Sequence, residues 1–81
     1  MPQLPRATAE QHIKAFQRDG WRVARVTGSH HILIKDGVEF HLTIPSHRGQ
    51  IVKTGLLKGL LRDAGLTNDE YLELFYGKQR R

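Results

Sequence analysis

The chain has 81 residues, a length that suits one domain and leaves little room for a deep internal pocket. Its 13 Lys and Arg outnumber 8 Asp and Glu, which gives a formal net charge of +5. This charge favours a polyanionic partner such as nucleic acid, although a positive surface that is only solvated has the same composition. The absence of cysteine excludes disulfides, thiolate catalysis and cysteine–zinc sites. We expect a cytoplasmic protein, since no run resembles a signal peptide or a membrane span.

An irregular segment and a helix are predicted at the N-terminus. Residues 1–7 contain two prolines and no apolar repeat, which is typical of a lead-in. Thr8 and Gln11 have the spacing of a capping box, so a helix should start there, and Gly20 should end it. His12 is expected on the helix surface. The apolar positions at helical spacing are Ala9, Ile13 and Phe16.

Three β-prone segments follow, at residues 21–26, 30–35 and 38–44. Asp36-Gly37 is a strong signal for a two-residue hairpin turn, which would place His30 opposite Thr43. Pro45 cannot donate to a ladder and should end the third strand. A three-residue turn would instead move every side chain to the other face.

This register separates two neighbouring histidines. His31 is expected to be partly buried at the edge of the covered face, whereas His30 lies on the open face with His41 diagonally within reach. Ile32 and Ile34 on the open face are either an ordinary exposed pair or a docking patch for a partner protein. The covered face is predicted to hold Leu33, Phe40, Leu42 and Ile44. The open face is predicted to hold His30, Ile32, Ile34, Glu39, His41 and Thr43.

Two further helices are predicted in the C-terminal third. Thr54 is expected to cap the first, which ends at Gly65, and Gly59 inside it suggests close packing against a neighbour. Thr67 and Glu70 form a second capping box that starts a short helix. The apolar positions are Leu56, Leu57, Leu60, Leu61 and Ala64 in the longer helix and Leu72 and Phe75 in the shorter one.

The predicted order is α-β-β-β-α with one short extra helix. Three antiparallel strands with helices on one face make a two-layer α+β domain. We expect a single domain over residues 1–81, with a disordered tail at residues 77–81.

One short motif stands between the first two strands. Residues 28–30 read Gly-Ser-His, which resembles the signature of the HicA-type (YcfA-like) mRNA interferase toxin family. Similar features are the Gly-Trp pair at 20–21, the Ile-Pro-Ser-His run at 44–47 and the segment 55–66 with its Ala-Gly-Leu ending. The resemblance covers about residues 8–75, and it departs from the family at Leu56, where many relatives carry Thr.

The resemblance implies a fold similar to the double-stranded-RNA-binding domain and endoribonuclease activity on mRNA. It also implies neutralisation by a HicB-type antitoxin, with a free toxin that is a monomer and a hetero-oligomeric complex. His30, the histidine after Gly-Ser, would be the catalytic residue. An imidazole can act as general acid or base near neutral pH, and RNA supplies its own nucleophile in the 2′-OH. No cofactor is implied.

Other residues are candidates for contacts with RNA or with the antitoxin. Basic side chains near His30 could bind phosphates, or could simply be solvated. His47 either touches substrate or bonds within its own loop. The candidates for RNA binding are Arg22, Arg25, Lys53, Lys58, Arg62 and His47, and those for the partner interface are Ile32, Ile34 and His41.

Three alternative interpretations fit parts of the same sequence. His30 and His41 with Glu39 nearby offer ligand atoms for zinc, but a zinc site requires three or four protein ligands in fixed geometry, and we expect a metal-independent enzyme. A non-catalytic RNA-binding module of the same fold would need no histidine on its sheet. A helper protein would use the isoleucine pair only to bind another chain.

Overall fold

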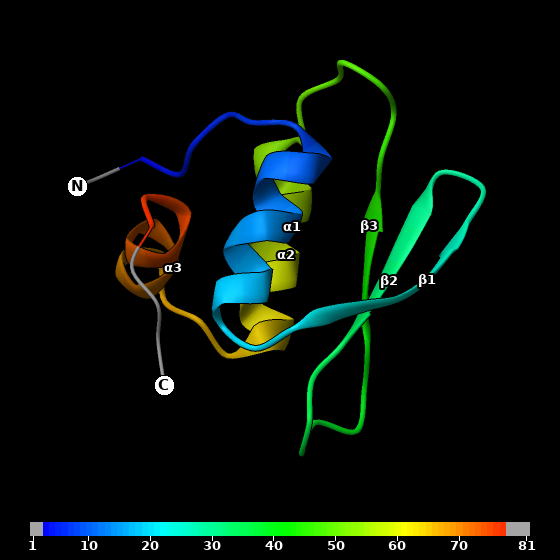
Figure 1. Ribbon diagram of the computed structural model, residues 1–81. Helices are drawn as coiled ribbons and strands as arrows, with labels where there is room; N and C mark the ends of the chain where they lie inside the picture. Colours follow the sequence, from blue (N-terminus) through cyan, green and yellow to red (C-terminus); the bar gives the residue numbers. More distant parts are fainter. Residues whose placement is uncertain (1–2, 78–81) are drawn as a thin grey trace.

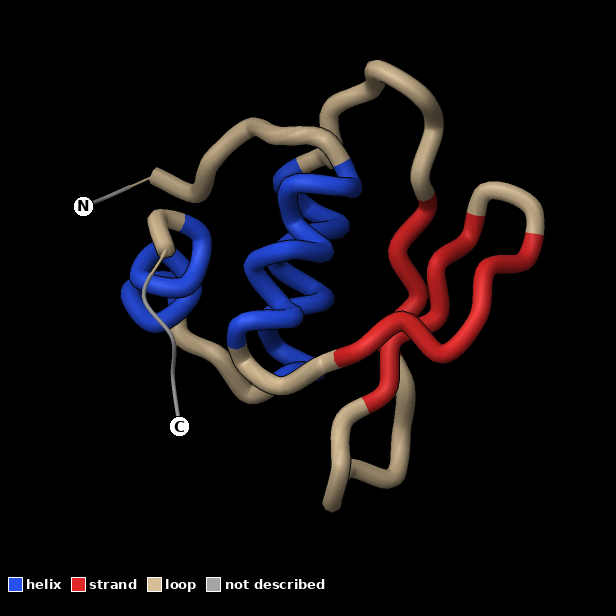
Figure 2. The backbone as a smooth tube through the Cα atoms, in the orientation of Figure 1, coloured by secondary structure: helices blue, strands red, loops and turns tan. Residues whose placement is uncertain are grey.

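The computed structural model describes residues 3–77, in which helices pack on one face of a three-stranded antiparallel sheet. Figures 1 and 2 show the two layers, with all helices on the same side of the strands. This architecture confirms the predicted α+β class and is that of the double-stranded-RNA-binding fold. The elements are α1 (Ala9–Arg18), β1 (Arg22–Thr27), β2 (His30–Ile34), β3 (Leu42–Pro45), α2 (Thr54–Ala64) and α3 (Asn68–Phe75).

The first helix begins and ends where the sequence predicts. The hydroxyl of Thr8 accepts the backbone N–H of Gln11, and the Gln11 side chain accepts the backbone N–H of Thr8. Gly20 follows the helix with a φ of +98°, a conformation that L-residues with a side chain rarely adopt. Both ends of α1 therefore follow from local hydrogen bonding and backbone freedom.

The connection between β2 and β3 is longer than predicted. The backbone N–H of Val38 donates to the Lys35 carbonyl at 3.1 Å, so the turn at Asp36-Gly37 does form. Of these two central residues only Gly37 has a positive φ, whereas the type I′ turn that matches strand twist needs two. The strands separate after this turn, and β3 begins only at Leu42.

Pairing resumes with a shift of two residues. Leu33 faces Leu42, whereas the prediction placed it opposite Phe40. Phe40 is therefore outside the sheet and 48 % exposed, which corrects its assignment to the core. A shift of two residues leaves each side chain on its predicted face, since the period of a strand is two. Pro45 is the last residue of β3, as expected.

A β-bulge interrupts β1. Val23 pairs with Leu33, but the next pair joins Arg25 to Ile32, so Ala24 has no partner of its own. An extra residue in one strand changes which side chains share a face. Because of this bulge Arg22 and Arg25, three positions apart, both lie on the open face of the sheet.

The core lies between the sheet and the helices. The strands contribute Leu33, Leu42 and Ile44 to this core, and all three are almost completely buried, as predicted. Trp21 stands just before β1 and is also buried. From the helices, the core receives Ala9, Ile13, Ala15, Phe16, Leu57, Leu60, Leu61, Tyr71 and Leu74.

The second and third helices differ from prediction in detail. Lys53 is the N-cap of α2 without a side-chain cap bond, so Thr54 is the first helical residue rather than the cap. Leu56 is 40 % exposed instead of buried, although Leu60, one turn further along α2, is buried. A Cβ at Gly59 would meet no atom within 4 Å, so the suggested close packing there is wrong. Gly65 ends the helix in the left-handed conformation, as predicted.

The capping box of α3 is confirmed, with the hydroxyl of Thr67 accepting the N–H of Glu70 at 3.1 Å. Its fully buried residues are Tyr71 and Leu74, whereas the predicted Leu72 and Phe75 are only half-buried. The predicted disordered tail lies, apart from its first residue, outside the described residues. Between residues 3 and 77, no helix has the length and apolar character needed to cross a membrane.

Candidate active site

His30 is the first residue of β2, directly after a two-residue turn. Gly28 in that turn has a φ of +59°, which favours glycine, and Thr27 pairs with His30 across the turn. The turn fixes the end of the hairpin at which the imidazole is held. The side chain of His30 is exposed.

The two adjacent histidines lie on opposite faces, as the alternation predicted. His31 pairs with the buried Ile44, and its ring is half-buried with an Nδ1 that has no hydrogen-bond partner among residues 3–77. His30 pairs with Pro45 and belongs to the open face. A solvent-facing imidazole can exchange protons with a bound substrate, whereas His31 is part of the packing.

Two cations share the open face with His30. Arg22 lies opposite Ile34 and Arg25 opposite Ile32, so both guanidinium groups come from the strand beside β2. Arg22 also forms an exposed ion pair with Asp36, 2.9 Å between Nη1 and Oδ1. Fixed positive charge on this face suits a phosphodiester backbone.

The end of β3 is held next to His30 by hydrogen bonds that the sequence did not reveal. The N–H of Ser46 donates to the carbonyl of Ser29 at 2.5 Å. The hydroxyl of Ser46 donates to the Glu10 carboxylate at 2.6 Å, which ties this segment to the first turn of α1. No local pattern marks Glu10, because the contact joins residues 36 positions apart.

The remaining RNA-binding candidates divide into two groups. Lys53 and His47 line one pocket beside Pro45, close to the strand end that pairs with His30. Lys58 and Arg62 are exposed on α2, whose other side packs on the sheet, so the structure does not bring them to the open face. Arg62 lies 3.8 Å from Asp63 in an exposed ion pair.

The predicted partner residues are not all brought together. Ile32 and Ile34 are half-buried on the open face. His41 precedes β3 and lines a hollow against Gly55 and Leu56, at the opposite end of that strand from Pro45. The expected diagonal contact between His41 and His30 is therefore wrong, because it depended on the shorter hairpin.

His12 is completely buried, which corrects its predicted place on the helix surface. Its Nδ1 is hydrogen-bonded to the hydroxyl of Tyr71 from α3. Burial lowers the pKa of His12 to about 4 and raises the pKa of Tyr71, so both groups are neutral at physiological pH. Among residues 3–77, no three His, Cys, Asp or Glu side chains are grouped as metal ligands would be.

Comparison with known families gives a match that spans most of the described fold. Residues 9–66 match the family model described as the HicA toxin of bacterial toxin–antitoxin systems, a span that runs from the start of α1 to just past α2. A search of the curated proteins returned no match. The family match covers well over half of the chain and includes His30. The chain belongs to the HicA toxin family of bacterial toxin–antitoxin systems.

Proposed function

We propose that this toxin is a metal-independent endoribonuclease that cleaves mRNA, inhibits translation and is neutralised by a HicB-type antitoxin. The observation that carries the proposal is the exposed imidazole of His30 at the end of the open sheet face. The positive side chains of Arg22 and Arg25 on the same face support it. Membership of a toxin family adds the biological setting.

The chemistry needs one positioned proton-transfer group. His30 in its neutral form takes the proton of a ribose 2′-OH, whose oxygen then attacks the adjacent phosphorus. The bond from phosphorus to the 5′-oxygen breaks, and that oxygen takes up a proton from the imidazolium or from water. A positioned acid–base group accelerates such a step by typically ~10²–10⁴-fold. Arginine side chains on the same face would neutralise charge on the phosphate.

The antitoxin is proposed to cover the same face. A protein that blocks a surface site must occupy that surface, and Ile32 and Ile34 offer apolar contacts beside His30. A complex of toxin and antitoxin that leaves His30 open to solvent would contradict this part of the proposal.

The first experiment compares two exposed histidines. We expect His30→Ala to reduce cleavage of purified mRNA by at least ~10²-fold, and His41→Ala, at the other end of β3, to leave cleavage unchanged. Both variants should keep the wild-type circular dichroism spectrum, since both side chains are exposed. Single-stranded DNA of the same sequence should remain intact, because it lacks the 2′-OH, and an excess of chelator should not reduce activity.

Undiminished cleavage by His30→Ala would remove this residue from the mechanism. A gel shift by the wild-type protein with no fragments at any pH would instead identify a non-catalytic RNA-binding module.

A further inference from the structure

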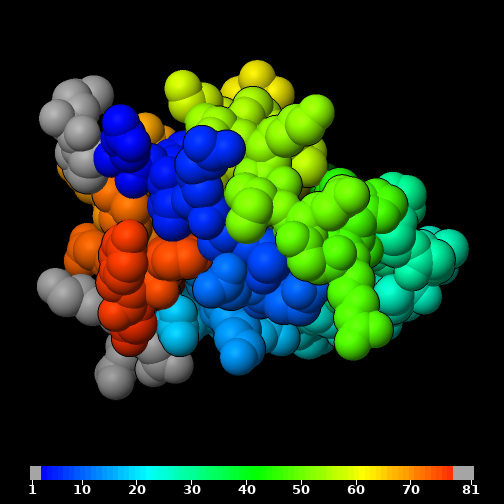
Figure 3. Space-filling model, turned by 90° about the horizontal axis from the view of Figure 1, so that it is seen from above, coloured from blue at the N-terminus to red at the C-terminus, as the bar shows by residue number. Residues whose placement is uncertain are grey.

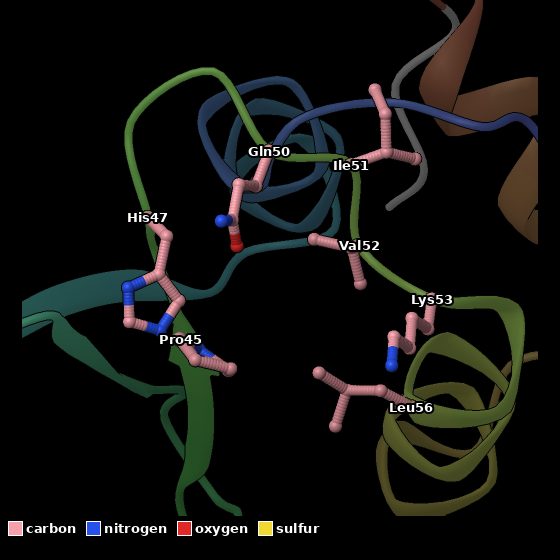
Figure 4. Close-up of a pocket in the computed structure, with 7 residues that line it drawn as sticks. All are labelled: Pro45, His47, Gln50, Ile51, Val52, Lys53 and Leu56. Carbon is pink, nitrogen blue, oxygen red and sulfur yellow. The ribbon is translucent and has the colours of Figure 1, made fainter.

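A small pocket lies between the end of β3 and the start of α2, next to the proposed cleavage site. Its volume is about 200 Å³. Figure 4 shows the side chains of Gln50, Val52 and Leu56 directed into the space between them, with the His47 ring at one side. The seven lining residues are Pro45, His47, Gln50, Ile51, Val52, Lys53 and Leu56.

The walls of this pocket are held in place from both sides. The strand side is fixed by Ser46, whose backbone and hydroxyl donate to Ser29 and Glu10. The other side is fixed to the N-terminal segment, where Val52 N–H donates to the Ala7 carbonyl at 2.9 Å and Ile51 forms a bridge with Thr8. Seen from above in Figure 3, the green 46–53 loop lies against the blue start of α1. The pocket is therefore preorganised by long-range contacts.

Its chemistry matches a nucleobase. Val52 and Leu56 provide apolar walls for the faces of a ring, and the imidazole of His47 can stack on a base. The Gln50 amide has both a donor and an acceptor, which is what the hydrogen-bonding edge of a base requires. Lys53 in the lining adds a cation for the attached phosphate. Typical ligand pockets have ~300–1,000 Å³, so this one suits a single ring system rather than a longer ligand.

The position of the pocket matters as much as its chemistry. Pro45 belongs to its lining and is also the residue that pairs with His30 across the sheet. Directly paired residues in antiparallel strands have Cα atoms ~4.5–5.5 Å apart. A base in the pocket would therefore belong to a nucleotide next to the phosphodiester that reaches His30.

We propose that this pocket binds one unpaired base of the RNA substrate, beside the scissile phosphodiester, and so contributes to the choice of cleavage site. The proposal rests on the proposed ribonuclease function. An apolar side chain of a protein partner would use Val52 and Leu56 but would leave the polar groups of Gln50, His47 and Lys53 without a role, so the observations favour a base.

The first test measures binding without cleavage. The amide resonances of the isotope-labelled wild-type protein are followed by NMR during titration with the 5′-monophosphates of uridine, cytidine, adenosine and guanosine, and with inorganic phosphate. At least one nucleotide at millimolar concentration should shift the amide resonances of Gln50, Val52 and Leu56. Inorganic phosphate should not reproduce these shifts. Leu56→Glu should abolish them, whereas the matched control Val26→Glu, at another exposed apolar position, should not.

No response of the pocket to any of the four nucleotides, or the same response to phosphate alone, would overturn the proposal. Shifts of the pocket resonances on addition of the antitoxin, but not of any nucleotide, would also overturn the proposal. They would assign the pocket to the protein interface.

The second test concerns specificity. Cleavage positions are mapped on a set of RNA oligonucleotides that differ in one base. We expect Gln50→Ala to lower the discrimination between bases at one position next to the cut by about tenfold, a typical loss for a base contact. The control Gln17→Ala, exposed on α1, should keep the wild-type preference.

If Gln50→Ala and Leu56→Glu both cleave RNA with the wild-type base preference, base binding by the pocket is refuted, whereas the ribonuclease function still holds. Absence of any cleavage would refute the ribonuclease function, and the nucleotide titration would still decide whether the pocket binds a base.

Discussion

His12 and Tyr71 form a buried polar pair between α1 and α3. The imidazole is fully buried, and its Nε2 has no hydrogen-bond partner in the part of the chain that the structure describes. A charged imidazole in this place would have to give up its hydration, and this burial lowers the pKa to about 4. Stability should therefore depend on pH through this residue.

The sign follows from the two states of the chain. The unfolded chain binds a proton at His12 below pH ~6.5, but the folded protein does so only below pH about 4. The free energy of unfolding is therefore highest above pH 6.5, where His12 is neutral in both states. It falls progressively down to pH 4, by on the order of 3 kcal/mol in total, as the unfolded chain takes up a proton at His12. His12→Leu should flatten this part of the stability curve, measured by urea denaturation between pH 7 and pH 4.5.

His41→Ala is the control, since that histidine is exposed, and it should leave the curve unchanged. An equal pH dependence in the wild type and in His12→Leu would show that other groups produce it.

Single residues also show what sequence could reveal about the site. The opposite faces of His30 and His31 follow from strand alternation, which survives an error of two residues in register. The burial of His12 could not be predicted in this way, because it depends on a helix 59 residues further along the chain. Glu10 and Gln50 were missed for the same reason, as their places are fixed by long-range packing.

At the scale of elements, the three helices begin in two different ways. Capping boxes start α1 and α3, whereas α2 starts at Lys53 with no side-chain cap bond. Thr67→Ala should destabilise the protein by ~1 kcal/mol, because it removes a cap hydrogen bond from a helix that covers the core. Thr54→Ala should change the free energy of unfolding by less than ~0.5 kcal/mol. Chemical denaturation of both variants tests this.

A loss of stability in Thr54→Ala as large as that in Thr67→Ala would mean that Thr54 does cap α2. The capping boxes were predictable because four consecutive residues determine them. The β2–β3 register was not, because Asp36-Gly37 forms its turn and the strands still separate after it.

At the scale of the whole molecule, α3 lies outside the segment that matches the family but closes the core. The match ends at residue 66, whereas Tyr71 and Leu74 are fully buried against α1. Arg18 of α1 also donates to the Leu74 carbonyl at 2.8 Å. Each buried large side chain contributes ~1.5–3 kcal/mol, so loss of this helix approaches the total stability of a small domain.

A chain that ends at Leu66 should therefore be largely unfolded at 25 °C by circular dichroism and by NMR dispersion. Tyr76→Ala, at a position that is 73 % exposed, should keep the wild-type fold and serves as the control. A well-dispersed NMR spectrum from the shortened chain would show that the matched segment is an autonomous unit.

The connection of residues 36–41 leaves the sheet at the far end of β2 and β3 from His30 and Pro45 (Figure 1). At Gly37 a side chain would have open space around it, although the positive φ there favours glycine. This loop is consequently the place to attach a fluorescent dye or an affinity label, through the exposed Glu39 replaced by cysteine in a chain that has no other thiol. Such a label would report on RNA and antitoxin binding without covering His30.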